Sequence, residues 1–337
     1  MGTFKGIKGV KVQSLASDPP AAQSLGQLWY NTASSALKYS VEGPGAWSTG
    51  GSCNERNDSG GSCGIQTACM YAGGRTGSPL LTTGSLISES YNGTAWTTGN
   101  NMTGSPRWTQ AGFGTTTTMV NVGGYYPGNV PQKTSVLYDG TSFSAGNDCN
   151  TARDGMRGTG TSTAGMIIGG GGAPSATETY NGTCYSTVNS LTTGRQKVCV
   201  VGLPSSALAV GGTPPASGSD LCEKYDGTCW SEQNDTNIPH GEAAASGTST
   251  AAMSMAGMTA PPTELRTAKT EQWDGTSWTE VSDLATARKS SPGSANSGTT
   301  SASCIWGGTD TPVSNQGSTA CEEWNEPVLA TKTVTVS

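Results

Sequence analysis

Apolar and polar residues alternate in short segments that recur along the whole chain. The segment at 163–170 reads TAGMIIGG and places Met166 and Ile168 on one face of an extended strand. A period of two is typical of a β-strand with one apolar face, and the glycine pair allows a sharp exit from it. Related segments lie at 67–74, 117–124, 205–212, 250–257 and 301–308. The pattern therefore predicts six equivalent strands.

A second recurring segment places two aromatic residues around a turn. It reads KYDGTCW at 224–230, with related copies at 90–96, 137–143, 179–185 and 272–278. Asn-Gly or Asp-Gly between aromatic residues indicates a β-hairpin, and a tight turn needs positive φ at both central positions. The first aromatic residues of the six units are Tyr91, Tyr138, Tyr180, Tyr225, Trp273 and Trp324.

A third element carries a basic residue before each strand of the first kind. It is present as Arg107, Arg153, Arg195 and Arg288, with Arg56 as a looser counterpart and His240 in the fifth unit. Acidic residues recur at matching hairpin positions, as Glu178, Glu223, Glu271 and Glu322. A residue that recurs in nearly every unit is expected to serve the unit, here through hydrogen bonds from the guanidinium to carbonyl groups. The alternative is a ring of arginines that binds anionic sugars, as in sialidases.

These three elements repeat every 42 to 51 residues, a period that suits four strands per unit. Such units cannot bury their apolar faces alone, so neighbours must stack and the ring must close. The sequence thus predicts an all-β, six-bladed propeller at 29–337, preceded by an extended N-terminal arm at about 1–28. The last unit lacks its outer hairpin strand, which could come from the segment near Trp47 or from the C-terminal TKTVTV at 331–336. The segment near Trp47 is favoured.

Composition and charge narrow the classes of function. The net charge of −6 argues against a nucleic-acid groove, and no apolar stretch is long enough to span a membrane. One histidine and no CxxC pair give no metal-ligand spacing, so neither a metal nor a cofactor is expected. The ten cysteines permit disulfides, and Cys304 with Cys321 is the leading pair, followed by Cys53 with Cys63. Small buried apolar side chains are the alternative reading of these thiols.

The arm at 1–28 has a composition of its own. It interleaves apolar and basic residues, namely Phe4, Lys5, Ile7, Lys8, Val10, Lys11 and Val12. We expect it to dock on another subunit, with the apolar residues inserted and the lysines facing an acidic surface.

The repeats resemble Kelch repeats, through the glycine pair that precedes a hairpin with two aromatic residues. Units such as TEQWDGTSWTEVSDLATAR at 270–288 are similar to repeats in structural proteins of marine tailed bacteriophages, and GQLWYNTASSALKY at 26–39 is similar to a hairpin of phage fibre proteins. The resemblance covers residues 26–326. It implies a multi-copy protein on the virion surface, such as a tail fibre, a tail-associated adhesin or a head decoration, assembled in the bacterial cytoplasm with other virion subunits.

Three aromatic residues depart from the repeat and fall near loops, namely Trp108, Tyr125 and Tyr126. Such rings stack on sugars, so these residues are the candidates for contact with a host glycan or protein. No catalytic residue is assigned, since the single histidine replaces a repeated arginine. The sequence therefore favours a non-enzymatic surface protein. The alternatives are a decoration or scaffold protein without host binding and a sialidase-like, carbohydrate-active enzyme.

Overall fold

The computed structural model describes residues 12–20, 26–42, 45–76, 84–172, 174–214, 218–259, 265–291, 299–310, 317–325 and 329–334. These residues form strands and turns and no helix, so none of them belongs to a helix that could cross a membrane. The prediction of an all-β protein is confirmed. The chain divides into two compact units, of which the larger is Trp47–Asn325 and the smaller combines Met1–Ala46 with Glu326–Ser337.

The larger unit consists of antiparallel sheets whose strands follow one another along the chain. The first sheet contains β6 (Gly61–Ile65), β7 (Ala68–Ala72), β9 (Ser88–Tyr91) and β10 (Trp96–Thr98). The second contains β11 (Ala111–Gly114), β12 (Met119–Val122), β15 (Ser135–Tyr138) and β16 (Phe143–Ala145). The third contains β17 (Arg157–Thr161), β18 (Ala164–Ile168), β19 (Thr177–Tyr180) and β20 (Tyr185–Val188).

The remaining sheets of the larger unit repeat this order. The fourth contains β21 (Cys199–Leu203), β22 (Ser206–Val210), β23 (Cys222–Tyr225) and β24 (Trp230–Glu232). The fifth contains β25 (Ala244–Gly247), β26 (Ala252–Met255), β29 (Thr270–Trp273) and β30 (Trp278–Glu280). The sixth has three described strands in the order β31 (Ala302–Trp306), β32 (Cys321–Asn325) and β4 (Ala46–Thr49). Short pairs join β5 (Asn57–Asp58) to β8 (Arg75–Thr76), β13 (Tyr125–Tyr126) to β14 (Val130–Pro131) and β27 (Met258–Thr259) to β28 (Leu265–Arg266).

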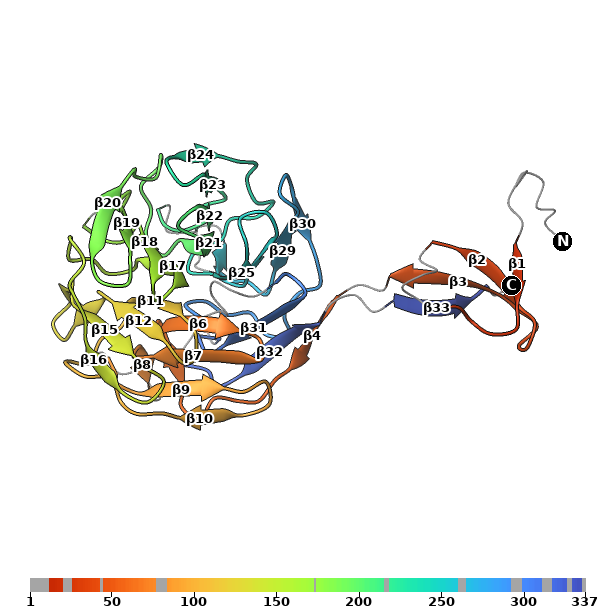
Figure 1. The fold of residues 1–337 in the computed structure, drawn as a ribbon, viewed down its shortest axis with the longest axis horizontal. Coiled ribbons are helices and arrows are strands. Elements are labelled where there is room, and N and C mark those ends of the chain that lie inside the picture. The colour runs from red at the N-terminus through yellow and green to blue at the C-terminus, as the bar shows by residue number, and fades with distance from the viewer. Residues whose placement is uncertain are drawn as a thin grey trace. The chain divides into compact units, whose positions relative to one another are not determined.

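The sheets of the larger unit lie around a common centre, as in a propeller (Figure 1). The strands nearest the centre are β6, β11, β17, β21 and β25, and the strands that end in a glycine pair come next in each sheet. In the sixth sheet the strand that contains Trp47 lies beside β32. The C-terminal strand β33 (Leu329–Thr333) pairs with β3 (Ala36–Glu42) instead.

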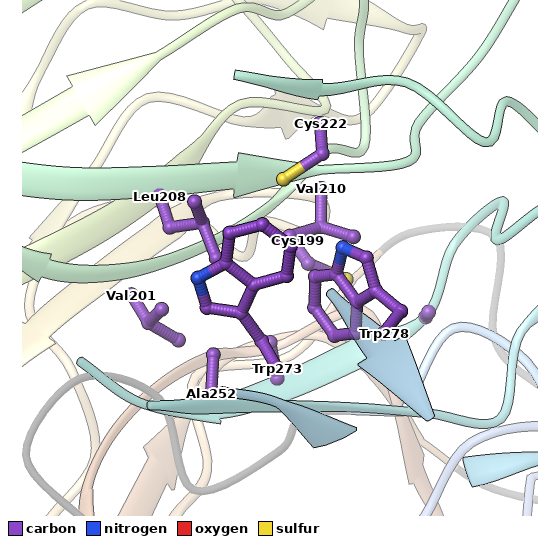
Figure 2. Close-up of a cluster of buried hydrophobic side chains, with 10 residues drawn as sticks. Cys199, Val201, Leu208, Val210, Cys222, Ala252, Trp273 and Trp278 are labelled. Atoms are coloured by element: carbon purple, nitrogen blue, oxygen red, sulfur yellow. The ribbon is translucent and has the colours of Figure 1, made fainter. Parts of the chain in front are cut away.

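Apolar faces of neighbouring sheets pack against one another and form the core. Figure 2 shows one such cluster, in which Cys199, Val201 and Leu208 of the fourth sheet meet Trp273 and Trp278 of the fifth. Similar clusters join the first sheet to the second, the second to the third, the third to the fourth and the fifth to the sixth. A further cluster joins the sixth sheet to the first, where Trp96 and Trp306 lie 5.1 Å apart. Each sheet therefore has partners on two sides.

Each hairpin turn is wider than the sequence predicted. In the fourth sheet Tyr225 pairs with Trp230, so four residues form the turn. The Asp226 carboxylate accepts hydrogen bonds from the backbone N–H groups of Thr228 and Cys229, each at 2.8 Å. Within this turn only Gly227 has a positive φ, of 97°. The predicted tight turn with positive φ at both positions is wrong, because the Asp side chain replaces part of the backbone turn.

The smaller unit is a sheet in the order β1-β2-β3-β33, where β1 (Gln13–Leu15) runs parallel to β2 (Leu28–Asn31). Asp18 organises it by accepting hydrogen bonds from Trp29 at 3.0 Å, Asn31 at 2.6 Å and Lys38 at 2.7 Å. These partners, led by Lys38, hold the pKa of Asp18 at about 2.

The boundary between the units differs from the predicted one at 28/29, because β2 pairs with β1 and β3, and β3 pairs with β33, so that neither strand joins a blade. Val12 is exposed. The other predicted anchor residues, Phe4, Lys5, Ile7, Lys8, Val10 and Lys11, lie outside the described residues.

Candidate functional site

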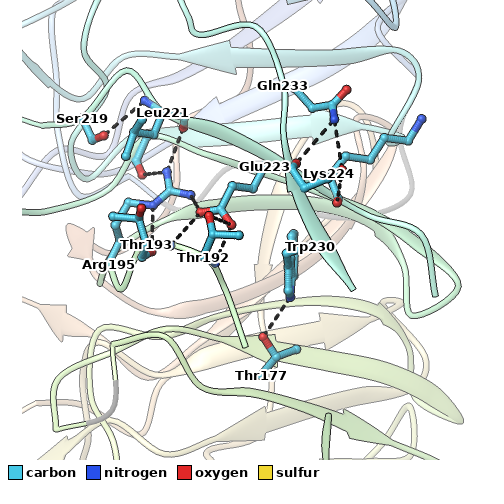
Figure 3. Close-up of polar contacts among 12 residues, drawn as sticks. Thr177, Thr192, Thr193, Arg195, Ser219, Leu221, Glu223, Lys224, Trp230 and Gln233 are labelled. Carbon is cyan, nitrogen blue, oxygen red and sulfur yellow. Dashed lines mark hydrogen bonds and ion pairs between the residues drawn. The ribbon is translucent and has the colours of Figure 1, made fainter. Parts of the chain in front are cut away.

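The repeated arginines are buried inside the sheets that carry them. Figure 3 shows Arg195, which donates hydrogen bonds to the Gly211 carbonyl at 2.7 Å, the Leu221 carbonyl at 2.8 Å and Glu223 at 2.6 Å. Glu223 in turn accepts a hydrogen bond from the Thr192 backbone N–H at 2.7 Å. Arg153 with Glu178 and Arg288 with Glu322 repeat the arrangement. These guanidinium groups are closed to solvent and cannot form a sugar-binding ring.

Three sheets vary this arrangement. In the first, Asn57 and not the predicted Arg56 takes the place of the arginine, and its Nδ2 donates to the Gly73 carbonyl at 2.8 Å. In the fifth sheet His240 takes the place of the arginine, with Nδ1 3.1 Å from the Ala256 carbonyl oxygen and Nε2 2.9 Å from Glu271. In the second sheet Val136 stands where the others have glutamate, and Arg107 donates instead to the Thr134 carbonyl and to the Tyr126 hydroxyl. Tyr126, a predicted ligand-contact residue, therefore serves a buried arginine.

A ring of backbone hydrogen bonds lies just before the innermost strands. Its members stand two residues after each repeated arginine, or after Asn57 and His240, which take the arginine's place: Ser59, Thr109, Gly155, Lys197, Glu242 and Ser290. All six have φ between 52° and 60°. Thr109 donates to Ser59, Gly155 to Thr109, Lys197 to Gly155, Ser290 to Glu242 and Ser59 to Ser290, over 2.5 to 3.0 Å.

Left-handed backbone is unfavourable for residues other than glycine, at a cost on the order of 1 kcal/mol each. Five of the six ring positions carry such residues, so the ring holds their side chains in place against this preference. Strained residues of this kind cluster at functional sites.

The ring surrounds the base of a polar pocket of about 360 Å³. Lys197, Glu242 and Ser290 line it, together with Asp154 and Tyr125 from the second and third repeats. Arg75, Trp108 and Lys289 also line the pocket. These side chains come from loops and from the short strands β8 and β13, so the repeat brings residues distant in sequence to one place.

Two ion pairs lie at the pocket. Arg75 pairs with the buried Asp58 at 2.5 Å. Lys197 forms an ion pair with Glu242, which also accepts a hydrogen bond from the Ser290 hydroxyl.

The two carboxyl groups of the pocket have opposite pKa shifts. Burial would raise the pKa of Glu242, but the charges of Lys197 and Lys289 outweigh burial and lower the pKa to about 2. Burial raises the pKa of Asp154 above its usual value, and the Tyr125 hydrogen bond and the Lys197 charge only partly oppose it. Burial and Asp154 likewise raise the pKa of Tyr125. The pocket thus favours an ionised Glu242 and a more readily protonated Asp154.

Of the predicted contact residues, Trp108 and Tyr125 line this pocket, with their rings 5.8 Å apart. Sequence reasoning missed Asp154, Lys197 and Glu242. A signal was available, because the two positions that follow the repeated arginine, which hold Asp154, Lys197 and Glu242, change from unit to unit. No group of three side chains suited to a metal ion occurs among the described residues.

The predicted disulfides are absent, since all ten cysteines are free thiols. Cys304 lies opposite Glu323 in the ladder and Cys321 opposite Trp306, so the two sulfurs are offset along the strands. Cys53 and Cys63 pack in different clusters, on opposite sides of the first sheet. Eight of the ten thiols are buried, which agrees with the alternative reading of small apolar side chains.

Comparison with known proteins shows the fold and not a family. No family description and no curated protein matches the sequence. Among solved structures, that of YjhT superposes with a TM-score of 0.66 at 11% sequence identity, over 84% of this chain and 99% of that one. The chain therefore has a propeller-like fold. The resemblance to Kelch repeats and to phage proteins rests on the residues alone and stays a prediction.

This likeness also contradicts the prediction that the protein is not an enzyme. That prediction treated the fold as a binding scaffold, whereas one fold can carry both binding proteins and enzymes. The error arose because chemistry was sought among repeated residues. The pocket uses positions at which the repeat varies.

Proposed function

We propose that the protein is a sialidase-like, carbohydrate-active enzyme that acts on an acidic sugar in the axial pocket. The observation that carries the proposal is the presence of two carboxyl groups with opposite pKa shifts in one polar pocket. Pairs of acids whose environments separate their pKa values are typical of acid–base sites. The repeated arginines have no part in it.

The charges of the pocket favour an anionic substrate. Asp58 neutralises Arg75, while Lys197 and Lys289 face a single strongly ionised carboxylate, Glu242. The excess of positive charge suits the carboxylate of an acidic sugar. Trp108 offers a ring face on which a pyranose can stack.

The chemistry follows from Asp154 and Tyr125. A carboxyl group with a raised pKa can protonate the oxygen of a leaving group, which is the role proposed for Asp154. We assign the Tyr125 hydroxyl, hydrogen-bonded to Asp154, as the nucleophile, the role that tyrosine has in sialidases. Its oxygen bonds to the anomeric carbon as the bond to the leaving oxygen breaks, and Asp154 takes up the phenol proton as it gives its own proton to the leaving group. Glu242, held by Lys197 and Ser290, stabilises positive charge that develops on the sugar ring.

The test is turnover of aryl glycosides of acidic sugars and of acidic polysaccharides. We expect Asp154→Asn and Tyr125→Phe to lower kcat by about 10²–10⁴-fold while the fold is retained. Asp148→Asn, at an exposed aspartate that pairs with Lys133, is the matched control and should leave kcat unchanged. Absence of turnover across the panel, or full activity of Asp154→Asn, would overturn the proposal.

We also propose that the six sheets are the blades of a closed ring in which β4 is the outer strand of the sixth. In support, Trp47 Nε1 donates a hydrogen bond to Thr270 Oγ1 of the preceding sheet at 3.2 Å. In the same way, Trp230 Nε1 of the fourth sheet donates to Thr177 Oγ1 of the third sheet at 3.1 Å. Trp47 also packs on Trp324 at 5.5 Å, as Trp230 packs on Tyr225 at 5.1 Å. The segment near Trp47 thus makes the contacts of an outer strand.

The virion surface remains our proposed location, and a host glycan the proposed source of the sugar. The proposal rests on the residue pattern of the repeats and on the predicted hairpin at 26–39. Deletion of residues 2–24 tests it: a folded protein that no longer enters particles supports anchoring by the arm. Normal incorporation would refute it.

A further inference from the structure

A second cavity lies among the innermost strands of the larger unit, next to the ring of backbone hydrogen bonds. It has a volume of about 30 Å³. Its wall includes Gly60, Gln110, Ala243 and Ser291, each of which directly follows a member of the ring. A cavity holds one water per roughly 10–15 Å³ on this measure, so two water-sized particles fit.

One full positive charge borders this cavity. Arg157 lies four residues after the repeated Arg153, and the equivalent positions of the other repeats carry Gly61, Ala111, Cys199, Ala244 and Pro292. These small residues leave the half-buried guanidinium as the one cation on the described wall of the cavity. Among described residues it has no hydrogen-bonded carboxylate, in contrast to Arg153 with Glu178.

Nearby groups do not neutralise Arg157. Glu242 acts on it only through space, because its two carboxylate oxygens are bound to Lys197 and to Ser290. Cys199 is a buried thiol whose pKa is raised to about 12, so it carries no charge at neutral pH. The segment 292–298, which lies outside the described residues, reads PGSANSG and contains no acid.

Arginine does not lose its proton in proteins, so the charge persists in a site with little water. Desolvation disfavours the charge of this guanidinium, which no carboxylate binds directly among the described residues, so an anion in the cavity would stabilise it. Gln110 adds an unsatisfied hydrogen-bond acceptor. Its Nε2 donates to the Ala72 carbonyl, while its buried Oε1 has no partner among the described residues.

We propose that this cavity binds one halide-sized inorganic anion, chloride under ordinary conditions, against the Arg157 guanidinium. A water beside the anion donates to Gln110 Oε1, and together they fill a volume of about two water-sized particles. The site is separate from the proposed catalytic pocket and uses none of its side chains.

Thermal unfolding in sodium chloride, compared with equal concentrations of sodium methanesulfonate, tests the proposal. Methanesulfonate has the same charge and is too large for the cavity. A ligand that binds only the folded state raises the midpoint, here by about 3 °C or more at saturating chloride. Arg157→Gln should lose this difference, and Lys133→Ala, at an exposed lysine of the same charge, should keep it.

Anomalous diffraction from wild-type crystals grown in bromide gives a measurement that does not depend on a variant. A bromide peak beside the Arg157 guanidinium supports the site. Equal midpoints in the two salts, or a cavity that holds water only in bromide, would overturn it. Neither result bears on turnover by the axial pocket, which Asp154→Asn tests separately.

Discussion

At the scale of single residues, repetition indicates a structural role and variation indicates chemistry. Arg153, Arg195 and Arg288 recur because each bonds two carbonyls and a glutamate inside its own sheet. The sequence predicted this role from recurrence alone. It did not reveal Asp154 or Glu242, because the function of these residues depends on several loops meeting in space. Local pattern carries no information about such a meeting.

Glu242 gives a prediction about pH. Its folded pKa of about 2 lies below the ordinary value of 4.5, so ionised Glu242 stabilises the fold above about pH 5, and this stability is lost as the pH falls toward 2. The difference amounts to about 3 kcal/mol. We expect Glu242→Gln to flatten this part of the stability profile, measured by urea unfolding at pH 2.5, 4 and 7.

Glu280→Gln is the control, since Glu280 is exposed and pairs only with the exposed Lys269. It should keep the wild-type profile. A Glu242→Gln profile as steep as that of the wild type would show that Glu242 titrates normally.

At the scale of elements, the sequence was accurate where a strand packs within its own repeat. The glycine-pair strands and the aromatic hairpins were predicted from local alternation, and both occur. It was inaccurate where the pairing is distant. Strand β3 pairs with β33, with Lys38 opposite Thr333, and no local sequence pattern predicts this pairing. The boundary at 28/29 was therefore placed too early.

The role of β4 can be tested by truncation. A chain of residues 45–325 keeps Ala46–Thr49, and a chain of residues 51–325 lacks this strand and Trp47. We expect the shorter chain to be less stable to urea by about 3 kcal/mol, the low end of the range for loss of a large aromatic residue, because the half-buried Trp47 loses its contacts with Trp324 and Thr270.

Within the longer chain, Trp47→Ala should reproduce most of this loss, while Thr49→Ala, at an exposed position of the same strand, should cost little. Equal stability of the two truncated chains would mean that β4 does not complete the sixth sheet.

At the scale of the whole molecule, the period of the repeat was sufficient to predict the fold class. Each unit exposes an apolar face on two sides, and only a neighbour on each side can cover both, as the six interlocking clusters show. The proposed activity could not be predicted from that period. A propeller with the same core, built from the same arginines and tryptophans, would fold equally well with other residues at 154, 197 and 242.

The pairing of β3 with β33 has a consequence for the order of synthesis. Strands β1, β2 and β3 are synthesised before the large unit, whereas β33, the fourth strand of their sheet, is synthesised after it. β4 likewise waits for β32. The early strands must therefore remain unpaired at one edge throughout translation, when an exposed edge is open to pairing with other chains. The small sheet can therefore be completed only after the large unit has been synthesised.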